Sequence, residues 1–209
     1  ACGSEACIFN ILGISVKYSN MEMLERGYGI SLRHLTNFAQ KTYADGGCFA
    51  PKVISAMDRE ISGTDSIARL YKAVLMIQFK LEGQAIMRNP SFCMEDRLLL
   101  DKIDYAHKCI TIGDVKYDLA DTDFPTVARE HPYELSPEED EVIGQLTESF
   151  QRSEKLQKHV RFLYSKGGLY KVFNGNLLLH GCIPLTPDGQ IMKFSVVGCK
   201  DLGGRAFLD

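Results

Sequence analysis

The apolar residues of this 209-residue chain change their spacing near Leu169. Before that point they recur every three or four residues, which is the period of a helix that buries one face. After it, short apolar runs are separated by turn residues such as Asn174-Gly175-Asn176 and Pro187-Asp188-Gly189, as in strands joined by tight turns. We therefore predict an α+β chain with a mainly helical region over residues 1–168 and β-strands over residues 169–209.

Start and stop signals divide the first region further. Ser136-Pro137-Glu138-Glu139 combines an N-cap, a proline at the first helical position and a glutamate three residues after the cap, which together begin a helix. The apolar stripe that follows continues to Gly167-Gly168, so the pattern predicts one long helix, the longest of the chain. The other predicted elements are helices starting at Ser4, at Ser31 and at Asp65 or Ser66, a short helix over 94–105, and a hairpin over 109–119.

Composition and motifs exclude several classes of protein. The formal net charge is -3 and the pI is about 6.0, so no overall positive field attracts a nucleic acid or an anionic membrane. The sequence contains no apolar run of the length that spans a membrane, and no Walker loop, dinucleotide fingerprint or nucleophile elbow. Seven cysteines without a two-residue spacing indicate reduced thiols in a cytoplasmic protein.

The two ends of the sequence resemble neither a natural start nor a natural stop. The chain opens on Ala1-Cys2-Gly3, without an initiator Met, and closes on Phe207-Leu208-Asp209 within an apolar stretch. We therefore expect it to be part of a longer polypeptide.

His180 is the most suggestive single residue. It ends the apolar run 177–179 and is followed by Gly181, so a strand end would present an imidazole beside a residue without a side chain, which leaves room for a metal ion or a phosphate. The alternative is a core histidine whose ring nitrogens are satisfied by neighbours. The spacing of the remaining histidines favours that alternative, because none forms a metal pattern with His180.

A second candidate is the cationic end of the long predicted helix, with Lys155, Lys158, Arg161 and Lys166 and, among them, Tyr164. Residues three apart share a helix face, so these cations could converge on a phosphate. The alternative is a solvated face on which acidic residues fill the first turn and basic residues the last, as the helix dipole favours.

Several longer stretches resemble class III fructose-1,6-bisphosphatases, and they occur in the order found in that family. These stretches are Glu25–Ile30 (ERGYGI), Ile77–Gln84 (IQFKLEGQ), Met94–Ile103 (MEDRLLLDKI), Asp123–Thr126 (DFPT), Ser153–Gly167 (SEKLQKHVRFLYSKG) and Asn174–Leu185 (NGNLLLHGCIPL). Together they extend from residue 25 to residue 185, which makes coincidence an unsatisfactory explanation.

The resemblance implies a calcineurin-like metallophosphatase core, a two-sheet sandwich with two divalent metal ions, manganese in this family. Residues 169–209 would supply strands of an incomplete core, and residues 1–168 would be a helical cap inserted between two metal-binding blocks. His180-Gly181-Cys182 matches the family's intermediate metal block, so the resemblance makes His180 a metal ligand. The other ligand blocks are absent from this chain. Caps of this kind often supply cations that bind the substrate. The resemblance therefore makes candidate substrate-binding residues of Lys155, Lys158, Arg161, Tyr164 and Lys166.

The implied reaction is hydrolysis of the 1-phosphate of fructose 1,6-bisphosphate, giving fructose 6-phosphate and phosphate in gluconeogenesis, by a metal-activated water. We expect the isolated chain to be inactive, because one imidazole cannot hold two ions that each need about four to six ligands. Two alternatives stay open: a metallophosphatase for another phosphate ester, and a non-catalytic helical module for binding or oligomerisation. We expect no nucleic-acid or membrane partner, and homo-oligomerisation is left open.

Overall fold

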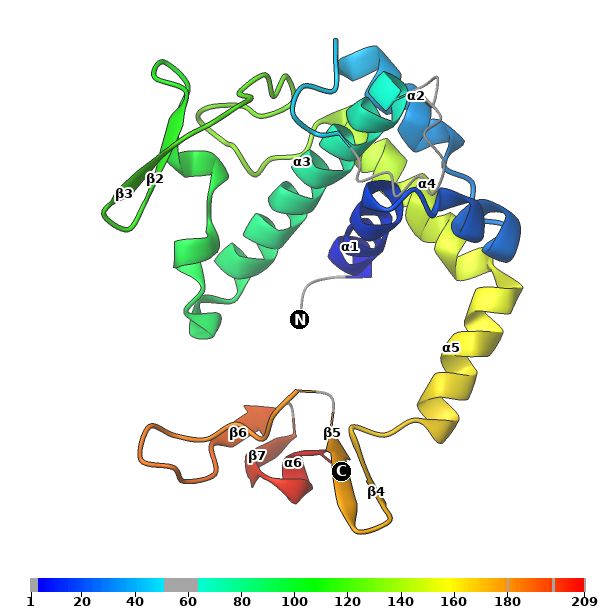
Figure 1. The fold of residues 1–209 in the computed structure, drawn as a ribbon, viewed down its shortest axis with the longest axis vertical. Helices are drawn as coiled ribbons and strands as arrows, with labels where there is room; N and C mark the ends of the chain where they lie inside the picture. The colour runs from blue at the N-terminus through cyan, green and yellow to red at the C-terminus, as the bar shows by residue number, and fades with distance from the viewer. Residues whose placement is uncertain (1–3, 51–63, 180, 197, 209) are drawn as a thin grey trace. The chain divides into compact units, whose positions relative to one another are not determined.

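The computed structural model describes residues 4–50, 64–179, 181–196 and 198–208 (Figure 1). The chain forms two compact units, Ala1–Glu154 and Lys155–Asp209. The change near Leu169 that the sequence shows marks the passage from helix to strand, whereas the compact units divide earlier, between residues 154 and 155.

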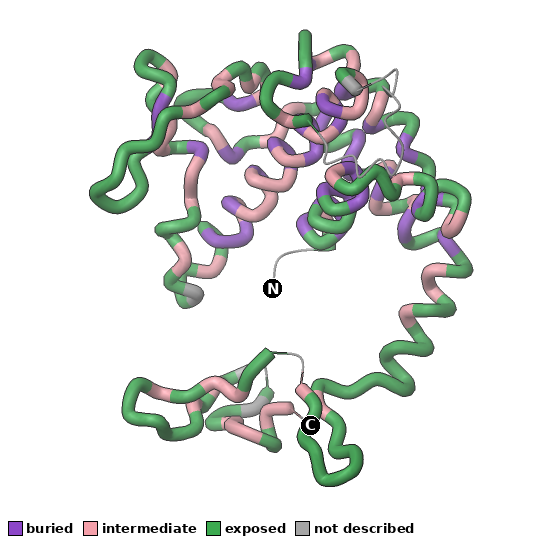
Figure 2. The backbone as a smooth tube through the Cα atoms, viewed as in Figure 1, coloured by how far each residue is buried: buried purple, intermediate pink, exposed green. Residues whose placement is uncertain are grey.

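Four helices form the core of the first unit: α1 (Ser4–Lys17), α2 (Arg33–Thr42), α3 (Thr64–Arg88) and α4 (Pro137–Arg152). α3 packs against both α1 and α2, and α4 contacts the same two helices. Buried residues line the sides on which these helices meet (Figure 2), among them Phe9, Leu12, Leu35, Val74 and Ile77. The first unit therefore has a conventional apolar core.

The predicted starts of the first three helices are close to the observed ones. α1 begins at Ser4, as predicted. α2 begins at Arg33 rather than directly after Ser31, whose Oγ accepts a hydrogen bond from the Arg33 N–H at 3.4 Å. α3 begins at Thr64, before the predicted caps, and Asp65 Oδ1 instead accepts from the Gly46 N–H at 3.1 Å.

The segment between α3 and α4 contains short turns and a small sheet. Between α3 and α4 the chain forms the 3₁₀ turns η2 (Pro90–Phe92), η3 (Glu95–Arg97) and η4 (Leu100–Lys102). It also forms the strands β1 (Ile103–Asp104), β2 (Cys109–Ile112) and β3 (Val115–Asp118). Outside this segment, a π-helical turn η1 (Met23–Gly27) follows α1. The three strands form an antiparallel sheet in the order β1-β2-β3, so the predicted hairpin is confirmed.

The predicted helix over residues 94–105 is wrong. Leu98 and Ile103 have extended backbones, with ψ of 116° and 119°. The Leu100 N–H donates to the Tyr133 hydroxyl at 3.1 Å. A side chain 33 positions away thus takes the hydrogen bond that a helix would have given to its own backbone.

The capping box at Ser136 is confirmed, but the single long helix after it is wrong. Ser136 Oγ accepts from the Glu139 N–H while the Glu139 carboxylate accepts from the Ser136 N–H. The helix stops at Arg152, Ser153 is extended with ψ 96°, and a new helix α5 (Glu154–Lys166) follows. Ser153 is buried and its Oγ donates to the Tyr28 carbonyl oxygen at 2.6 Å, which holds the break in place. Among the described helices the longest is α3, with 25 residues.

The second unit contains most of α5, two hairpins and a short terminal helix. β4 (Tyr170–Phe173) pairs with β5 (Asn176–Leu179), β6 (Lys193–Val196) pairs with β7 (Cys199–Gly203), and α6 (Arg205–Leu208) follows. The predicted strands after residue 169 are thus present as two separate antiparallel pairs. None of the residues between 155 and 208 whose burial the structure describes is buried. No helix within the described ranges is both long and apolar enough to cross a membrane.

Candidate functional site

The predicted metal ligand His180 lies outside the described residues. On one side of it β5 ends at Leu179, and on the other Gly181 has φ +101°, a conformation that side-chain-bearing residues rarely adopt. Open space surrounds the position where a Cβ of Gly181 would stand. Within the ranges that the structure describes, no group of three or more His, Cys, Asp or Glu side chains is arranged to hold a metal ion.

The predicted substrate-binding residues all lie on or at the start of α5, and all are exposed. A helix turns by about 100° per residue, so Lys155, Lys158 and Arg161 occupy one broad side of α5. Lys166 returns to the angular position of Lys155 three turns later, whereas Tyr164 lies opposite Lys155 but next to Arg161, three residues before it. In helical geometry the four cations therefore share one broad side of α5, and Tyr164 borders that side at Arg161.

The apolar side chains of α5 lie mainly opposite the cations. In helical geometry Leu156, Val160 and Leu163 lie opposite Lys158, whereas Phe162 lies between the angular positions of Lys155 and Lys158. Leu163 is 64% exposed and Tyr164 is 87% exposed. α5 is therefore an amphipathic helix with a cationic side and an opposite apolar side, on which Leu163 is exposed.

The first unit contains a groove that was not predicted from the sequence. It has a volume of about 550 Å³ and is lined by residues of two family-like stretches, Tyr28 and Gly29 from one and Ser153 from the other, together with His34 and Arg152. The Ser153 Oγ to Tyr28 carbonyl hydrogen bond joins the two stretches at its floor. Arg152 already pairs with Glu148, so the groove does not concentrate positive charge as a phosphate site would.

Two buried ion pairs involve lysines of α3, one of which, Lys80, belongs to the family-like stretch Ile77–Gln84. Lys72 Nζ lies 2.7 Å from Asp121 Oδ2, and Lys80 Nζ lies 2.7 Å from Glu139 Oε2. Lys72 is also within 6 Å of the ring centres of Tyr43, Phe49 and Phe124. Both lysines are fully buried, so these pairs tie α3 to the segment that follows the small sheet, and their role is structural.

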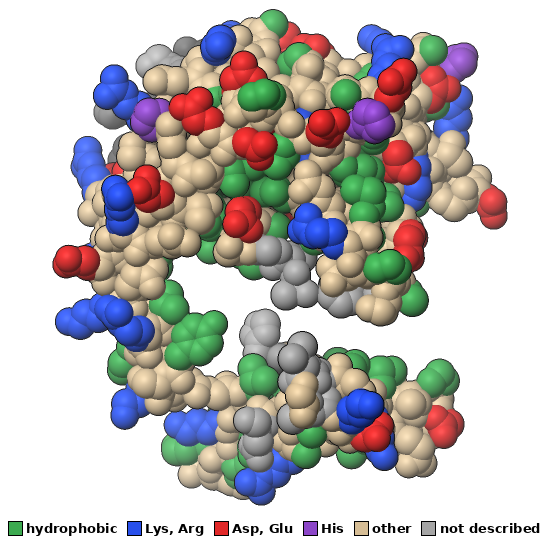
Figure 3. Space-filling view, turned by 180° about the vertical axis from the view of Figure 1, so that it is seen from behind, with side chains coloured by type: hydrophobic (Ala, Val, Ile, Leu, Met, Phe, Trp, Pro, Cys, Tyr) green, Lys and Arg blue, Asp and Glu red, His purple; other side chains and the backbone are tan. Residues whose placement is uncertain are grey.

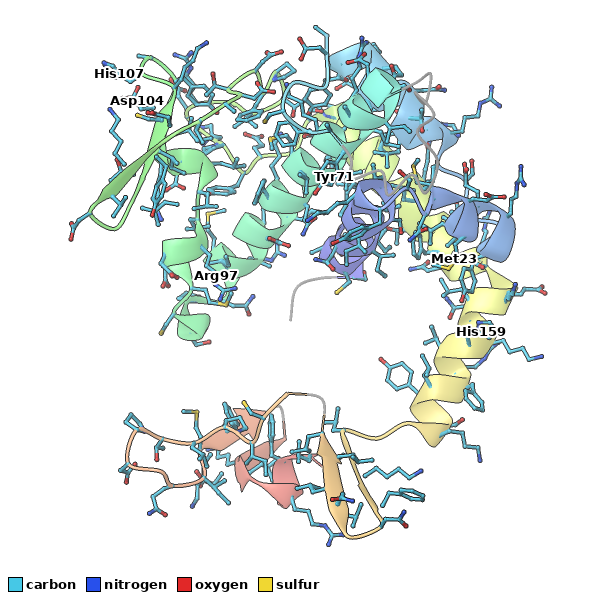
Figure 4. All side chains as sticks on the ribbon, in the orientation of Figure 1. Met23, Tyr71, Arg97, Asp104, His107 and His159 are labelled. Carbon is cyan, nitrogen blue, oxygen red and sulfur yellow. The ribbon has the colours of Figure 1, made fainter. Side chains whose placement is uncertain are left out.

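One exposed pair of an imidazole and a carboxylate stands at the turn between β1 and β2. His107 Nδ1 lies 2.7 Å from Asp104 Oδ2, and Figure 4 shows both residues at the same end of the sheet, whereas His159 comes from α5. Asp104 Oδ1 accepts from the N–H groups of Ala106 and His107. The hydrogen bond with the His107 side chain is the main cause that holds the pKa of Asp104 below its usual value. The geometry is that of a side chain closing a turn.

Comparison with known proteins confirms the resemblance found in the sequence. The family model of the Firmicute fructose-1,6-bisphosphatases matches residues 1–209. A protein named fructose-1,6-bisphosphatase class 3 from Clostridium botulinum (strain Langeland) is 46% identical over 214 residues, and one of the same name from Clostridium novyi (strain NT) is 46% identical over 213 residues. No solved structure matches the chain.

In each of these two alignments all of this chain is covered, but only 31% of the relative. The chain therefore spans about a third of the length of the curated relatives it matches. Both the family model and these alignments extend over the whole chain. The chain belongs to the Firmicute fructose-1,6-bisphosphatase family.

Proposed function

We propose that a polypeptide of the relatives' full length, containing these residues, hydrolyses the 1-phosphate of fructose 1,6-bisphosphate to give fructose 6-phosphate and phosphate. The observation that carries this proposal is the family match over residues 1–209. The reaction is a step of gluconeogenesis and belongs in the cytoplasm, in keeping with seven cysteines and no two-residue cysteine spacing.

The proposed cofactor is a pair of divalent metal ions, manganese, with His180 as one ligand. The described residues supply no group of three or more candidate ligands, so the remaining ligands would have to come from elsewhere in the longer polypeptide. When bound, such ions polarise a phosphoryl group and lower the pKa of a coordinated water. Because the described residues do not form the centre, no catalytic step is assigned to them.

The cationic side of α5 is proposed to bind substrate phosphate. Lys155, Lys158 and Arg161 share one side of the helix and are exposed, so they can form charge-assisted hydrogen bonds with phosphate oxygens. Lys166 lies near the same side and could extend the contact. Tyr164 borders the same side, one turn after Arg161.

Two alternatives remain, as they did from the sequence. A metallophosphatase for another phosphate ester would use the same cations with a different sugar or alcohol. A binding or oligomerisation module is favoured by a specific observation, the exposed apolar side of α5. Neither alternative requires a nucleic acid, and a chain with a net charge of -3 has no overall electrostatic attraction for one.

A phosphate-release assay with manganese tests the proposal. We expect turnover of fructose 1,6-bisphosphate by the full-length protein and none by the isolated chain, because the chain supplies one predicted ligand for two ions. His180→Ala in the full-length protein should remove bound metal, measured by elemental analysis, whereas His159→Ala should not. Turnover by the isolated chain would refute its predicted inactivity. Unchanged metal content in His180→Ala would refute the assignment of His180 as a metal ligand.

A second set of variants tests substrate binding. Lys158→Ala should raise KM about tenfold or more with a smaller effect on kcat, since loss of one charge-assisted hydrogen bond costs about 1.5–3 kcal/mol. Lys41→Ala removes an exposed lysine from α2 and should leave both constants unchanged. Equal effects of the two substitutions would mean that α5 has no special role. A panel of other phosphate esters distinguishes the alternative substrate.

A further inference from the structure

The strand β3 in the first unit has one edge that no described strand covers. The small sheet has the order β1-β2-β3, so β2 is the one described strand that pairs with β3. Figure 1 shows this hairpin at the periphery of the first unit, away from α1 and α2. An open edge presents backbone N–H and C=O groups that can pair with another strand. The edge of β3 is therefore a candidate interaction surface.

The pairing of β3 with β2 determines which backbone groups point to the open edge. The Leu119 N–H donates to the Lys108 carbonyl oxygen at 2.8 Å, one register step beyond the last pair of the β2–β3 ladder. Hydrogen-bonded and non-hydrogen-bonded pairs alternate along an antiparallel ladder. The backbone groups of Tyr117 therefore point toward β2, like those of Leu119. Those of Lys116 and Asp118 point to the open edge.

The charges of Lys116 and Asp118 favour one register between two copies of β3. An antiparallel pair at this edge must match outward-pointing residues, so each of these two residues stands opposite one of the same two in the other copy. Lys116 opposite Lys116, or Asp118 opposite Asp118, sets like charges side by side and is destabilising. The remaining register sets Lys116 of each copy opposite Asp118 of the other, which makes two complementary pairs about a two-fold axis. Both side chains are exposed.

The same register brings apolar side chains together on the other face of the sheet. It sets Tyr117 of one copy opposite Tyr117 of the other, and Val115 opposite Leu119. Tyr117 is 50% exposed and Val115 is 52% exposed. Ile112, which pairs with Val115 across the β2–β3 ladder, is 41% exposed on the same face. A second copy therefore shields apolar surface that one copy leaves in water.

No large region of one charge opposes this approach on the face of the first unit that Figure 3 shows. Acidic and basic side chains are interspersed there, and the formal net charge of the chain is -3. Net repulsion between two copies is therefore small. A lysine alone on an edge strand hinders pairing with other strands, whereas a lysine followed two residues later by an aspartate is complementary to itself across a two-fold axis.

We propose that two copies of this protein associate through the open edges of β3, with Lys116 of each copy opposite Asp118 of the other. The two small sheets then form one continuous antiparallel sheet. About four backbone hydrogen bonds join the copies in this register, and so short an interface gives an association that depends on protein concentration. The inference rests on the geometry of the first unit and not on the proposed phosphatase chemistry.

Disulfide cross-linking of the full-length protein tests the register. Tyr117 faces itself in a non-hydrogen-bonded pair, where the two Cα atoms are about 4.5 Å apart, so Tyr117→Cys should give a covalent dimer after mild oxidation. Val115→Cys is the matched control on the same strand and face. The two copies of residue 115 lie about 13 Å apart in this register, too far for a disulfide. Non-reducing electrophoresis measures both.

The unsubstituted protein sets the baseline, because several of its described cysteines are exposed. A covalent dimer above this baseline for Tyr117→Cys alone supports the proposal. Equal cross-linking of Tyr117→Cys and Val115→Cys overturns it, because the register is then wrong. No cross-linking above the baseline also overturns it and is the result expected if another segment of the longer polypeptide covers the β3 edge.

Reversal of charge tests the complementary pairs without relying on cysteine. In analytical ultracentrifugation of the full-length protein, Lys116→Asp alone and Asp118→Lys alone should each weaken association about tenfold or more, because each sets like charges opposite each other twice. An equimolar mixture of the two single variants should associate again, since it restores both opposite-charge pairs. Lys41→Asp, on α2, changes the net charge equally and should have no effect.

The rescue distinguishes a specific interface from a general effect of charge. Association that is not restored in the mixture, or that Lys41→Asp weakens as much as Lys116→Asp does, overturns the proposal. Sedimentation as a monomer at every concentration overturns it as well. Phosphate release is a separate readout: association without turnover refutes the proposed function alone, and turnover by a protein that never associates refutes this interface alone.

Discussion

Glu139 joins three parts of the first unit through one carboxylate oxygen. Its Oε2 accepts from the Ser136 N–H at 2.7 Å, which completes the capping box of α4, and from Lys80 Nζ at 2.7 Å. Lys80 Nζ also donates to the Thr126 carbonyl oxygen at 2.5 Å. Both charged side chains are fully buried. A lysine within a family-like stretch thus connects α3, the 126 region and the start of α4.

Removing the lysine from this pair should be strongly destabilising. Lys80→Met leaves a buried carboxylate without its counter-charge, so we expect the free energy of unfolding to fall by about 3–5 kcal/mol in urea denaturation. Lys80→Met combined with Glu139→Gln should lower the free energy of unfolding by less than the sum of the two single effects, because the pair is coupled. Lys116→Met, at an exposed position of β3, is the control. A loss below about 1 kcal/mol for Lys80→Met would show that the pair contributes little.

Tyr43 should make the first unit sensitive to alkaline pH. Burial raises the pKa of its phenol well above the usual value; the Thr126 hydroxyl, 3.5 Å away, opposes the rise, and the carboxylates of Glu139 and Asp123 add to it. The folded state therefore keeps the proton that the unfolded chain loses above a pH of about 10. This contribution to stability is complete below that pH and is lost as the pH rises further.

The measurement is the free energy of unfolding at several pH values from about 9 to 11. In this window the slope of the free energy of unfolding against pH should be negative for the parent chain. It should be less negative for Tyr43→Phe, which has no phenol to ionise. Lysines titrate in the same range, so the difference between the two chains, not the slope itself, is the test. Parallel slopes would mean that Tyr43 ionises equally in both states.

At the scale of elements, Gly83 of α3 and Gly144 of α4 form a contrasting pair. A Cβ on Gly83 would overlap the ring of Tyr133, whereas nothing lies within 4 Å of a Cβ on Gly144. The Tyr133 hydroxyl donates to Asp101 Oδ1 at 2.6 Å and accepts from the Leu100 N–H, so the ring position also fixes the turn η4. The close approach of α3 to Tyr133 therefore requires a glycine.

We expect opposite effects from the same substitution at these two glycines. Gly144→Ala should raise the free energy of unfolding by about 0.5–1 kcal/mol, because alanine has the better helix propensity. Gly83→Ala should lower it by about 1–3 kcal/mol, the usual cost of overpacking. Urea denaturation of both variants measures the difference, and a gain for Gly83→Ala would show that the Tyr133 ring moves aside at little cost.

The errors made from the sequence at this scale share one physical origin. The capping box at Ser136 and the hairpin over 109–119 were predictable because neighbouring residues determine them. The break between α4 and α5 depends on the Tyr28 carbonyl, 125 positions from Ser153, and the turns at 94–104 depend on Tyr133. No local pattern contains these distant partners, so a continuous apolar stripe was read as a continuous helix.

At the scale of the whole molecule, the family was predictable and the chemistry of its site was not. Long stretches such as Ile77–Gln84 identified the family, yet in the structure Lys80 and Gly83 of that stretch serve packing. The substrate-binding role of the α5 residues stays a prediction, because the structure shows only that they are exposed on one helix. The metal role of His180 stays a prediction, because His180 lies outside the described residues and the described residues hold no group of three or more candidate ligands.

The two compact units should therefore respond differently to the loss of a leucine. Leu35 in α2 is fully buried and Leu163 in α5 is 64% exposed. In the isolated chain Leu35→Ala should lower the free energy of unfolding by about 2–5 kcal/mol, because it leaves a cavity in the helical core. Leu163→Ala should change it by less than about 0.5 kcal/mol, because no packed neighbour is lost. Urea denaturation followed by circular dichroism measures both. A loss above about 1 kcal/mol for Leu163→Ala would mean that the apolar side of α5 is already covered in the isolated chain.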